Sequence, residues 1–173
     1  NYNKVETHYA KFCYLFSGCS VLTSAPELPA TTLAEDCYGR MFEGCTNLTT
    51  APKLPAETLA EQCYEGMFMN CSNLTSAPEL PAETLASNCY LNMFWGCTKL
   101  STVTMLAPSD KITSIFAYMD WLDGAGTGAN SRTLKVQDED AYNALVTTGY
   151  LPENWKKGAT NTTVQNKDGA EIK

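Results

Sequence analysis

A 26-residue repeat is the feature that most constrains how this chain can fold. Cysteine recurs at this spacing, and so does leucine (Cys19, Cys45, Cys71, Cys97; Leu22, Leu48, Leu74, Leu100). Further columns hold tyrosine, phenylalanine, leucine and two sets of prolines (Tyr38, Tyr64, Tyr90; Phe42, Phe68, Phe94; Leu33, Leu59, Leu85; Pro26, Pro52, Pro78; Pro29, Pro55, Pro81). A unit this small cannot bury its own apolar face, so neighbouring units are expected to stack.

Each unit is expected to hold one short strand, an extended return and one or two helical turns. Parallel strands are predicted at five leucines (Leu22, Leu48, Leu74, Leu100, Leu134), each of the first three ending at the following proline, which cannot donate to a ladder. Helical turns are predicted between Thr84 and Cys97, where apolar residues recur at near-helical spacing. Strands lie ~4.8 Å apart but packed helices ~8–10 Å, so the stack should curve with its strands on the concave side.

The repeat is similar to a known family. Phe68-Met-Asn-Cys71-Ser-Asn-Leu74-Thr-Ser-Ala77 resembles the Phe-x-x-Cys-x-x-Leu-x-x-Ile core of BspA-type (treponemal-type) leucine-rich repeats, over residues 9 to about 106. Alanine or valine replaces the isoleucine (Ala25, Ala51, Ala77, Val103), which implies a thinner core there. The resemblance implies an α/β fold, a right-handed leucine-rich-repeat solenoid of about four 26-residue repeats with a C-terminal helix/strand cap. It also implies a cell-surface or secreted bacterial protein with protein partners.

Residues 1–173 are predicted to form a single domain, with repeats in 1–106 and a capping region with a polar tail in 107–173. The period breaks after Leu106, as expected where a terminal unit caps a stack. The expected cap elements are a helix from Ser109 or Asp110 to Leu122, a loop over 123–131, a strand over 132–136 and a helix from Asp138 to about Thr148 with Gly149 at its C-cap. Trp155 is expected to seal the core, and the tail to form a hairpin at Asp168-Gly169.

Charge and hydropathy exclude several classes of partner. The chain has 19 acidic and 12 basic residues, a net charge of −7, and no basic face of the kind that nucleic acid requires. No apolar run approaches the ~18–20 residues of a membrane span, so no transmembrane segment is expected. The sequence begins at Asn1 with no signal peptide, so any export signal or anchor is expected to lie outside it.

The eight cysteines allow several interpretations. Zinc sites favour close Cys pairs, whereas the spacings within a unit here are Cys-x5-Cys or Cys-x7-Cys and His8 is the only histidine. We therefore predict no metal site, and the absence of an orienting third group also disfavours a Cys13–His8 nucleophile. Disulfides within units and free, buried thiols both remain open, and the reach of a disulfide favours free thiols.

No catalytic or cofactor-binding residue is predicted, and we expect the chain not to be an enzyme. Gly124-Ala-Gly126-Thr-Gly128 lacks the strand before it and the Lys-Ser/Thr after it that a nucleotide-binding loop needs. It is interpreted as an ordinary loop, and no cofactor is expected.

Two residue columns are candidates for a binding surface. Short polar and charged side chains are expected on the concave strand side (Thr23, Thr49, Thr75, Ser101; Glu27, Lys53, Glu79). An aromatic set is expected on the other side (Tyr38, Tyr64, Tyr90, Trp95), although repeat packing alone would also explain both columns. The favoured function is a non-catalytic adhesion or protein-interaction module that binds a protein ligand on the concave face. The alternatives are a glycan-binding module that uses the aromatic face, and a structural spacer.

Overall fold

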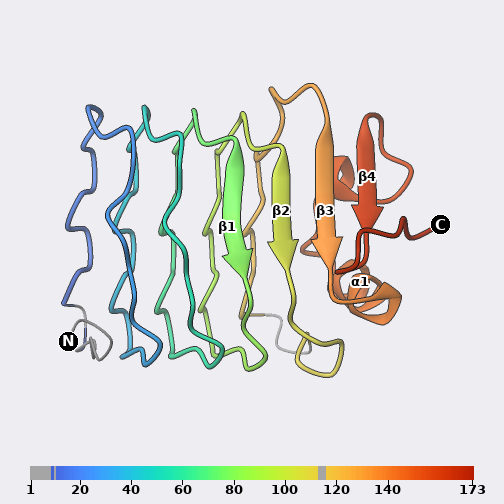
Figure 1. The fold of residues 1–173 in the computed structure, drawn as a ribbon, viewed down its shortest axis with the longest axis horizontal. Helices are drawn as coiled ribbons and strands as arrows, with labels where there is room; N and C mark the ends of the chain where they lie inside the picture. The colour runs from blue at the N-terminus through green and yellow to red at the C-terminus, as the bar shows by residue number, and fades with distance from the viewer. Residues whose placement is uncertain (1–8, 10, 113–115) are drawn as a thin grey trace.

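The computed structural model describes Tyr9, residues 11–112 and residues 116–173. Its regular elements are β1 (Ser76–Leu80), β2 (Thr102–Met105), β3 (Arg132–Val136), α1 (Glu139–Thr147), the short 3-10 helix η2 (Glu153–Trp155) and β4 (Thr162–Gln165). The four strands form one parallel sheet in the order β1-β2-β3-β4 (Figure 1). A parallel sheet with a single α-helix belongs to the α/β class, as predicted.

Segments of the chain that repeat every 26 residues lie side by side (Figure 1). We call them rung 1 (11–33), rung 2 (34–59), rung 3 (60–85) and rung 4 (86–111), of which rung 1 is described from Lys11 onward. In the first two rungs the only strand pairing is an isolated parallel bridge between Ser24 and Thr50, and a second bridge joins Thr58 to Thr84. The hydrogen-bonded sheet therefore begins at rung 3 and continues into the C-terminal region.

The strand positions were only partly predicted. Leu134 lies in β3, whose observed bounds match the prediction, but β1 and β2 begin two residues after Leu74 and Leu100. The N–H groups of these leucines close tight turns, onto the carbonyls of Cys71 and Cys97, so the leucines precede the strands. No strand forms at Leu22 or Leu48.

Proline does not end β1, contrary to the prediction. Pro78 lies inside the strand, where the pairing with β2 shifts register between Ser76 and Glu79. Three steps along β1 oppose two along β2, from Thr102 to Thr104. An extra residue of this kind leaves the ladder locally unpaired, which is how a sheet accommodates a residue without an N–H donor.

The predicted helical turns are absent, because the backbone between residues 84 and 97 forms successive tight turns. Successive backbone N–H groups alternate between a hydrogen bond within the turn and a hydrogen bond to the next segment of chain. The Leu91 N–H donates to the Asn88 carbonyl (3.2 Å), whereas the Tyr90 N–H donates to the Ala117 carbonyl (2.7 Å). We call these stretches of rungs 1–4 (11–19, 34–45, 60–71 and 86–97) the turn segments.

A left-handed residue at every fourth position explains the turn geometry. In rung 4 these residues are Asn88 (φ 55°), Asn92 (φ 55°) and Gly96 (φ 72°). Asn and Gly tolerate this region best. At Gly96 a Cβ atom would lie 2.5 Å from Oδ1 of Asn70 in rung 3, so a side chain there would require the Asn70 side chain to move.

The described residues lack the feature from which curvature of the stack was expected. The expectation depended on helices ~8–10 Å apart behind the strands. Instead, hydrogen bonds of 2.7–3.1 Å join the turn segments of adjacent rungs. Both sides of a rung are therefore held at backbone hydrogen-bonding distance, and Figure 1 shows the rungs nearly parallel.

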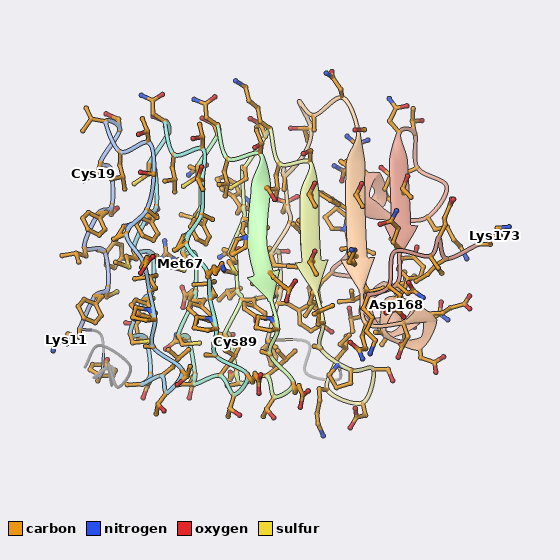
Figure 2. The ribbon with its side chains drawn as sticks, in the orientation of Figure 1. Lys11, Cys19, Met67, Cys89, Asp168 and Lys173 are labelled. Atoms are coloured by element: carbon orange, nitrogen blue, oxygen red, sulfur yellow. The ribbon has the colours of Figure 1, made fainter. Side chains whose placement is uncertain are left out.

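The core consists of columns of identical side chains between the strands and the turn segments. The Phe16–Phe42, Phe42–Phe68 and Phe68–Phe94 ring pairs are all stacked at 5.6 Å between centroids. Methionine and cysteine fill the neighbouring columns, with Met67 and Cys89 fully buried (Figure 2). Repetition of the side chains thus gives each rung the same neighbours.

The C-terminal region closes the stack largely as expected. The Asp138 carboxylate accepts the Ala141 N–H (2.8 Å) as the N-cap of α1, and the last helical residue is followed by Thr148 at the C-cap, one position before the predicted Gly149. Trp155 is fully buried and its indole N–H donates to the Ala125 carbonyl (3.1 Å).

One other cap prediction was wrong. The described residues between Ser109 and Leu122 form turns rather than a helix, and 113–115 lie outside the described residues. The 123–131 segment contains no helix or strand, as expected for a loop, although Ala125 and Gly126 within it are buried. The tail pairs β4 with β3 and then forms the expected hairpin, with a turn at 166–170 and an antiparallel bridge between Gln165 and Glu171.

Candidate interaction face

The column of hydroxyl side chains predicted as a binding surface lies on the strand side. Thr23, Thr49 and Thr75 are exposed and Ser101 is partly exposed. The Thr49 hydroxyl donates to the Thr23 carbonyl (3.1 Å), and the Ser101 hydroxyl to the Thr75 carbonyl (2.9 Å). Two of these hydroxyls therefore link rungs, and their oxygens still present lone pairs to solvent.

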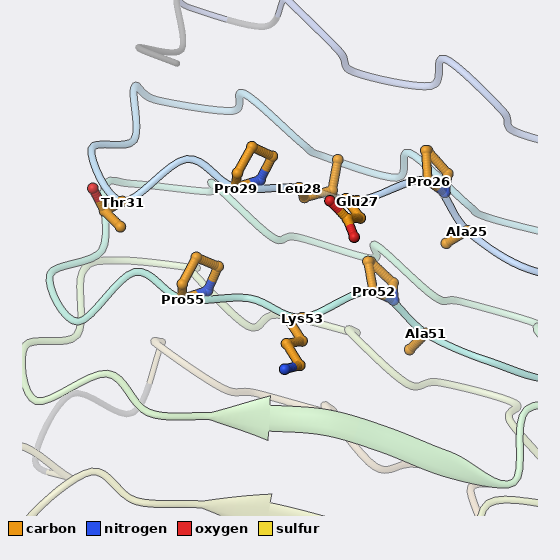
Figure 3. A pocket seen from close by; sticks show the side chains of 10 residues that line it. All are labelled: Ala25, Pro26, Glu27, Leu28, Pro29, Thr31, Ala51, Pro52, Lys53 and Pro55. Atoms are coloured by element: carbon orange, nitrogen blue, oxygen red, sulfur yellow. The ribbon is translucent and has the colours of Figure 1, made fainter. Parts of the chain in front are cut away.

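The charged column lies on the same side and borders two shallow grooves. Glu27, Lys53 and Glu79 are all exposed. A groove of about 550 Å³ lies between the Ala-Pro-Glu-Leu-Pro segment of rung 1 and the Ala-Pro-Lys-Leu-Pro segment of rung 2 (Figure 3). A second groove, of about 400 Å³, continues from Lys53 to Glu79. We call the hydroxyl column, the charged column and these grooves the strand face.

Proline gives the strand face its open backbone. Prolines in rungs 1 and 2 lack N–H donors, and no backbone hydrogen bond joins 26–29 to 52–55. The peptide groups of Glu27 and Lys53 therefore have no partner among the described residues, unlike those of β2 and β3. A groove with apolar proline rings and unpaired peptide groups can contact both apolar and hydrogen-bonding groups of a partner.

One part of the strand face was missed by the sequence analysis. A hollow of about 430 Å³ lies between Thr75, Lys99, Ser101 and the segment 128–131. Lys99 occupies the column of Asn47 and Asn73, and its ammonium donates to the Asn73 carboxamide oxygen (2.7 Å). The 26-residue repeat predicts that Lys99 lies in line with Asn47 and Asn73. It cannot predict the position of residues 128–131, because they do not follow the repeat.

The aromatic column does not form a surface. Tyr38, Tyr64 and Tyr90 are only 1–2% exposed, and their rings stack on one another at 6.0 and 6.2 Å. Burial raises the pKa of Tyr38 to about 12. These rings have no free face for a sugar, so the aromatic-face alternative fails for the three tyrosines and the interpretation of this column as repeat packing holds. Trp95 is 40% exposed and its indole N–H donates to the Asp123 carboxylate (3.0 Å).

All eight cysteines are in the thiol form, and the six from Cys37 to Cys97 are buried. The Cys71 thiol donates to the Phe42 carbonyl (3.1 Å), and the Cys97 thiol to the Phe68 carbonyl (3.0 Å). Desolvation raises the pKa of Cys97 to about 12, and desolvation together with the Asp36 carboxylate raises that of the partly buried Cys13 to about 11. Thiols held in the protonated form are poor nucleophiles and poor metal ligands.

The described residues contain no convergent set of metal-binding side chains. Among them, no three His, Cys, Asp or Glu residues are placed to hold an ion, and His8 lies outside them. The same residues include no helix long and apolar enough to cross a bilayer. The feature of the surface that remains is therefore the strand face.

Comparison with family models, curated proteins and solved structures found no match to this chain. The functional argument therefore depends on the repeat, the strand face and the chemistry of the side chains described above. Of these, the strand face receives hydroxyl side chains from all four rungs and exposed charged side chains from rungs 1–3.

Proposed function

We propose that this chain is a right-handed leucine-rich-repeat solenoid of the BspA type, and that it acts as a non-catalytic protein-interaction or adhesion module at the cell surface or in secreted form. The observation that carries the proposal is the strand face. Exposed hydroxyl and charged side chains recur there from rung to rung, and grooves run between them. Solenoids use extended surfaces of this kind to bind partners.

The chemistry of the strand face favours a protein ligand. Its hydroxyl side chains are short, so each contributes hydrogen bonds worth only about 0.5–1.5 kcal/mol net and little apolar contact area. Alternating charges at Glu27, Lys53 and Glu79 favour a partner with a complementary pattern of charges. Affinity then has to come from several rungs acting together, which a folded protein surface can engage simultaneously.

A glycan-binding role has weaker support, and a spacer role is the remaining alternative. Three of the four aromatic side chains proposed for sugar stacking are buried, which leaves Trp95 as the exposed member of that set. A spacer would need the stack and no binding surface at all.

The experiment is a binding comparison between two surfaces. The chain is immobilised and tested against a panel of extracellular-matrix proteins and, separately, a glycan array. We expect saturable binding to a protein, lost in the Thr49→Arg/Thr75→Arg double variant because two guanidinium groups would obstruct the centre of the strand face. The matched control is Thr127→Arg, at an exposed threonine outside the strand face.

The outcomes distinguish the three roles. Protein binding that disappears in the double variant and persists in the control supports the proposal. Binding only to glycans, lost in Trp95→Ala, would favour the glycan role. A chain that binds neither class would act as a spacer, and the adhesion proposal would fail.

A further inference from the structure

The rung 1 end of the stack has a row of carbonyl groups without donors among the described residues. In rung 2, four carbonyls accept N–H groups from rung 1 at 2.7–3.0 Å (Cys37 from Phe12, Gly39 from Tyr14, Met41 from Phe16, Glu43 from Gly18). The carbonyls at the same repeat positions in rung 1 belong to Lys11, Cys13, Leu15 and Ser17. No described residue donates to any of them.

The same end exposes apolar side chains. Of the described residues, six large hydrophobic side chains are exposed, and four of them lie here (Tyr9 69%, Tyr14 53%, Leu15 54%, Val21 88%). Phe12 and Phe16 stack on Tyr38 and Phe42, continuing the ring columns into rung 1. Next to them is a hollow of about 410 Å³. This end therefore combines apolar contact area with a regular row of hydrogen-bond acceptors.

Two further positions in rung 1 lack, among the described residues, the neighbour that later rungs have. The thiols of Cys45, Cys71 and Cys97 each donate to a phenylalanine carbonyl of the preceding rung at 3.0–3.1 Å. Cys19 occupies the same column, and its thiol has no such carbonyl among the described residues. A Cβ atom added at Gly18 would meet nothing within 4 Å, whereas one added at Gly96 would meet Asn70.

The polarity of the row decides which occupant fits. A second copy placed end to end through its own rung 1 would set carbonyls against carbonyls, which cannot hydrogen-bond to each other. The row needs a segment that supplies N–H donors at alternate residues, with aromatic and leucine side chains between them. The turn segments of this repeat have that pattern, because Gln62, Tyr64, Gly66 and Phe68 donate in this way to rung 4.

We propose that the rung 1 end is a docking surface for a segment of another polypeptide chain that carries this 26-residue repeat and adds to the stack as a further rung. The docked segment donates alternate N–H groups to the carbonyls of Lys11, Cys13, Leu15 and Ser17, stacks rings on Phe12 and Phe16, and covers Leu15. Peptide recognition by extension of a hydrogen-bonded edge follows the same physical principle. The hollow beside this surface shares Pro26, Glu27, Leu28 and Pro29 with the first groove of the strand face. The carbonyl row and the ring columns belong to the turn segment instead, so the proposal does not depend on the proposed function.

The test uses a labelled synthetic peptide of residues 58–83 and the full chain under reducing conditions. Saturable binding is expected. The matched control peptide is N-methylated at the nitrogens of Tyr64 and Phe68, which removes two of the required donors and leaves the side chains unchanged. Its affinity should be lower by at least about tenfold, since two net hydrogen bonds are lost.

Two variants of the full chain locate the binding site. Leu15 and Phe116 are equally exposed, at 54% and 53%, and lie in different parts of the chain. Leu15→Asp should weaken binding of the peptide at least about tenfold, because an apolar contact is lost and a charge is desolvated. Phe116→Asp should leave the affinity within about twofold, and so should the Thr49→Arg/Thr75→Arg double variant, because neither lies at the rung 1 end.

Several results would overturn the proposal. These are absence of saturable binding up to about 1 mM peptide, equal affinity for the N-methylated peptide, or no effect of Leu15→Asp. Sedimentation of the chain without peptide gives a further check. A dimer that Leu15→Asp dissociates would show that a second copy occupies this end, and the repeat-segment proposal would be wrong.

Discussion

At the scale of single residues, the buried thiols act as hydrogen-bond donors between rungs. Cys45, Cys71 and Cys97 donate to phenylalanine carbonyls of the preceding rung at nearly equal distances. Those carbonyls also accept a backbone N–H in a tight turn, as Phe42 does from Cys45. A thiol is a weak donor, but it is the small apolar side chain that can fill this column and satisfy a buried lone pair as well.

Replacement of Cys71 by alanine should therefore lower the free energy of unfolding by about 1–3 kcal/mol, because a buried sulfur atom and a hydrogen bond are both lost. Urea denaturation under reducing conditions measures the change. Cys19→Ala is the matched control, since Cys19 is only partly buried and lacks a carbonyl partner among the described residues. Equal losses in the two variants would contradict a role for the thiol–carbonyl bond.

The tyrosine column shows why single residues were hard to place from the sequence. Its period is the same whether the rings face inward or outward, and the phenolic hydroxyl is compatible with either environment. Cys63 and Tyr64 are adjacent in the sequence and both are buried. They lie in a segment whose backbone turns every four residues, whereas helical turns were predicted for the repeat. The hydroxyl and charged columns were placed on the strand side correctly, because alternation along extended chain is easier to read.

At the scale of elements, β3 owes its position to Arg132. The Arg132 guanidinium donates to the carbonyls of Gly126 (2.8 Å), Asn154 (2.8 Å) and Thr160 (2.7 Å). These carbonyls belong to the 123–131 loop, to η2 and to the turn before β4. One side chain thus fixes the approach of the cap to the sheet through charge-assisted hydrogen bonds.

Arg132→Met should keep much of the aliphatic packing and remove these hydrogen bonds. We expect the free energy of unfolding to fall by about 2–4 kcal/mol, since hydrogen bonds to a charged group are worth about 1.5–3 kcal/mol each and water replaces part of them. Thermal and urea unfolding provide the measurement. Lys135→Met, on the same strand, should change stability by less than about 0.5 kcal/mol, and a comparable loss there would contradict the assignment.

The turn segments are the element that sequence patterns misidentified. Cys89, Met93 and Cys97 recur every four residues, a spacing that fits an α-helix over so short a stretch. The distinguishing signal was the second series, Asn88, Asn92 and Gly96, at the same interval. Residues that favour left-handed geometry at every fourth position prevent a helix. In contrast, β3 and α1 were predicted correctly, because alternation and an N-cap aspartate are local signals.

At the scale of the whole molecule, burial of ionisable groups makes the fold sensitive to alkali. Desolvation raises the pKa of both Cys89 and Cys97 to about 12, from 9.0. The unfolded chain loses these protons first as pH rises. The stability associated with each protonated thiol is therefore fully present below pH 9 and is lost progressively as pH rises toward 12.

Between pH 8 and pH 10, each of these two thiols should lower the free energy of unfolding by about 1.4 kcal/mol. Urea denaturation at several pH values, in reducing and oxygen-free buffer, measures the slope. In the Cys97→Ala variant, the decrease in the free energy of unfolding between pH 8 and pH 10 should be smaller than in the unchanged chain by about 1.4 kcal/mol, the contribution of one thiol. A free energy of unfolding that does not change from pH 8 to pH 10 would show that these thiols are accessible to solvent.

The repeat columns predicted the stacked arrangement and the side that carries the strand face, because a fixed period forces equal neighbours. They did not predict where hydrogen-bonded strands begin. The start of the sheet depends on two features of the β1–β2 pair. Thr104 stands where the preceding repeat has Pro78, and β1 accommodates one extra residue between Ser76 and Glu79. The grooves of the strand face follow from the same prolines, and their depth depends on three-dimensional packing.

The equality of the ring contacts has a consequence for how such a gene can change. Phe16–Phe42, Phe42–Phe68 and Phe68–Phe94 are stacked at the same 5.6 Å, so in the phenylalanine column the contact between two neighbouring rungs is interchangeable with the next. Recombination that removes or duplicates one whole period replaces an interface by an equivalent one. The coding sequence can therefore lengthen or shorten in steps of one period while every intermediate retains a continuous core, and the area of the strand face varies with it.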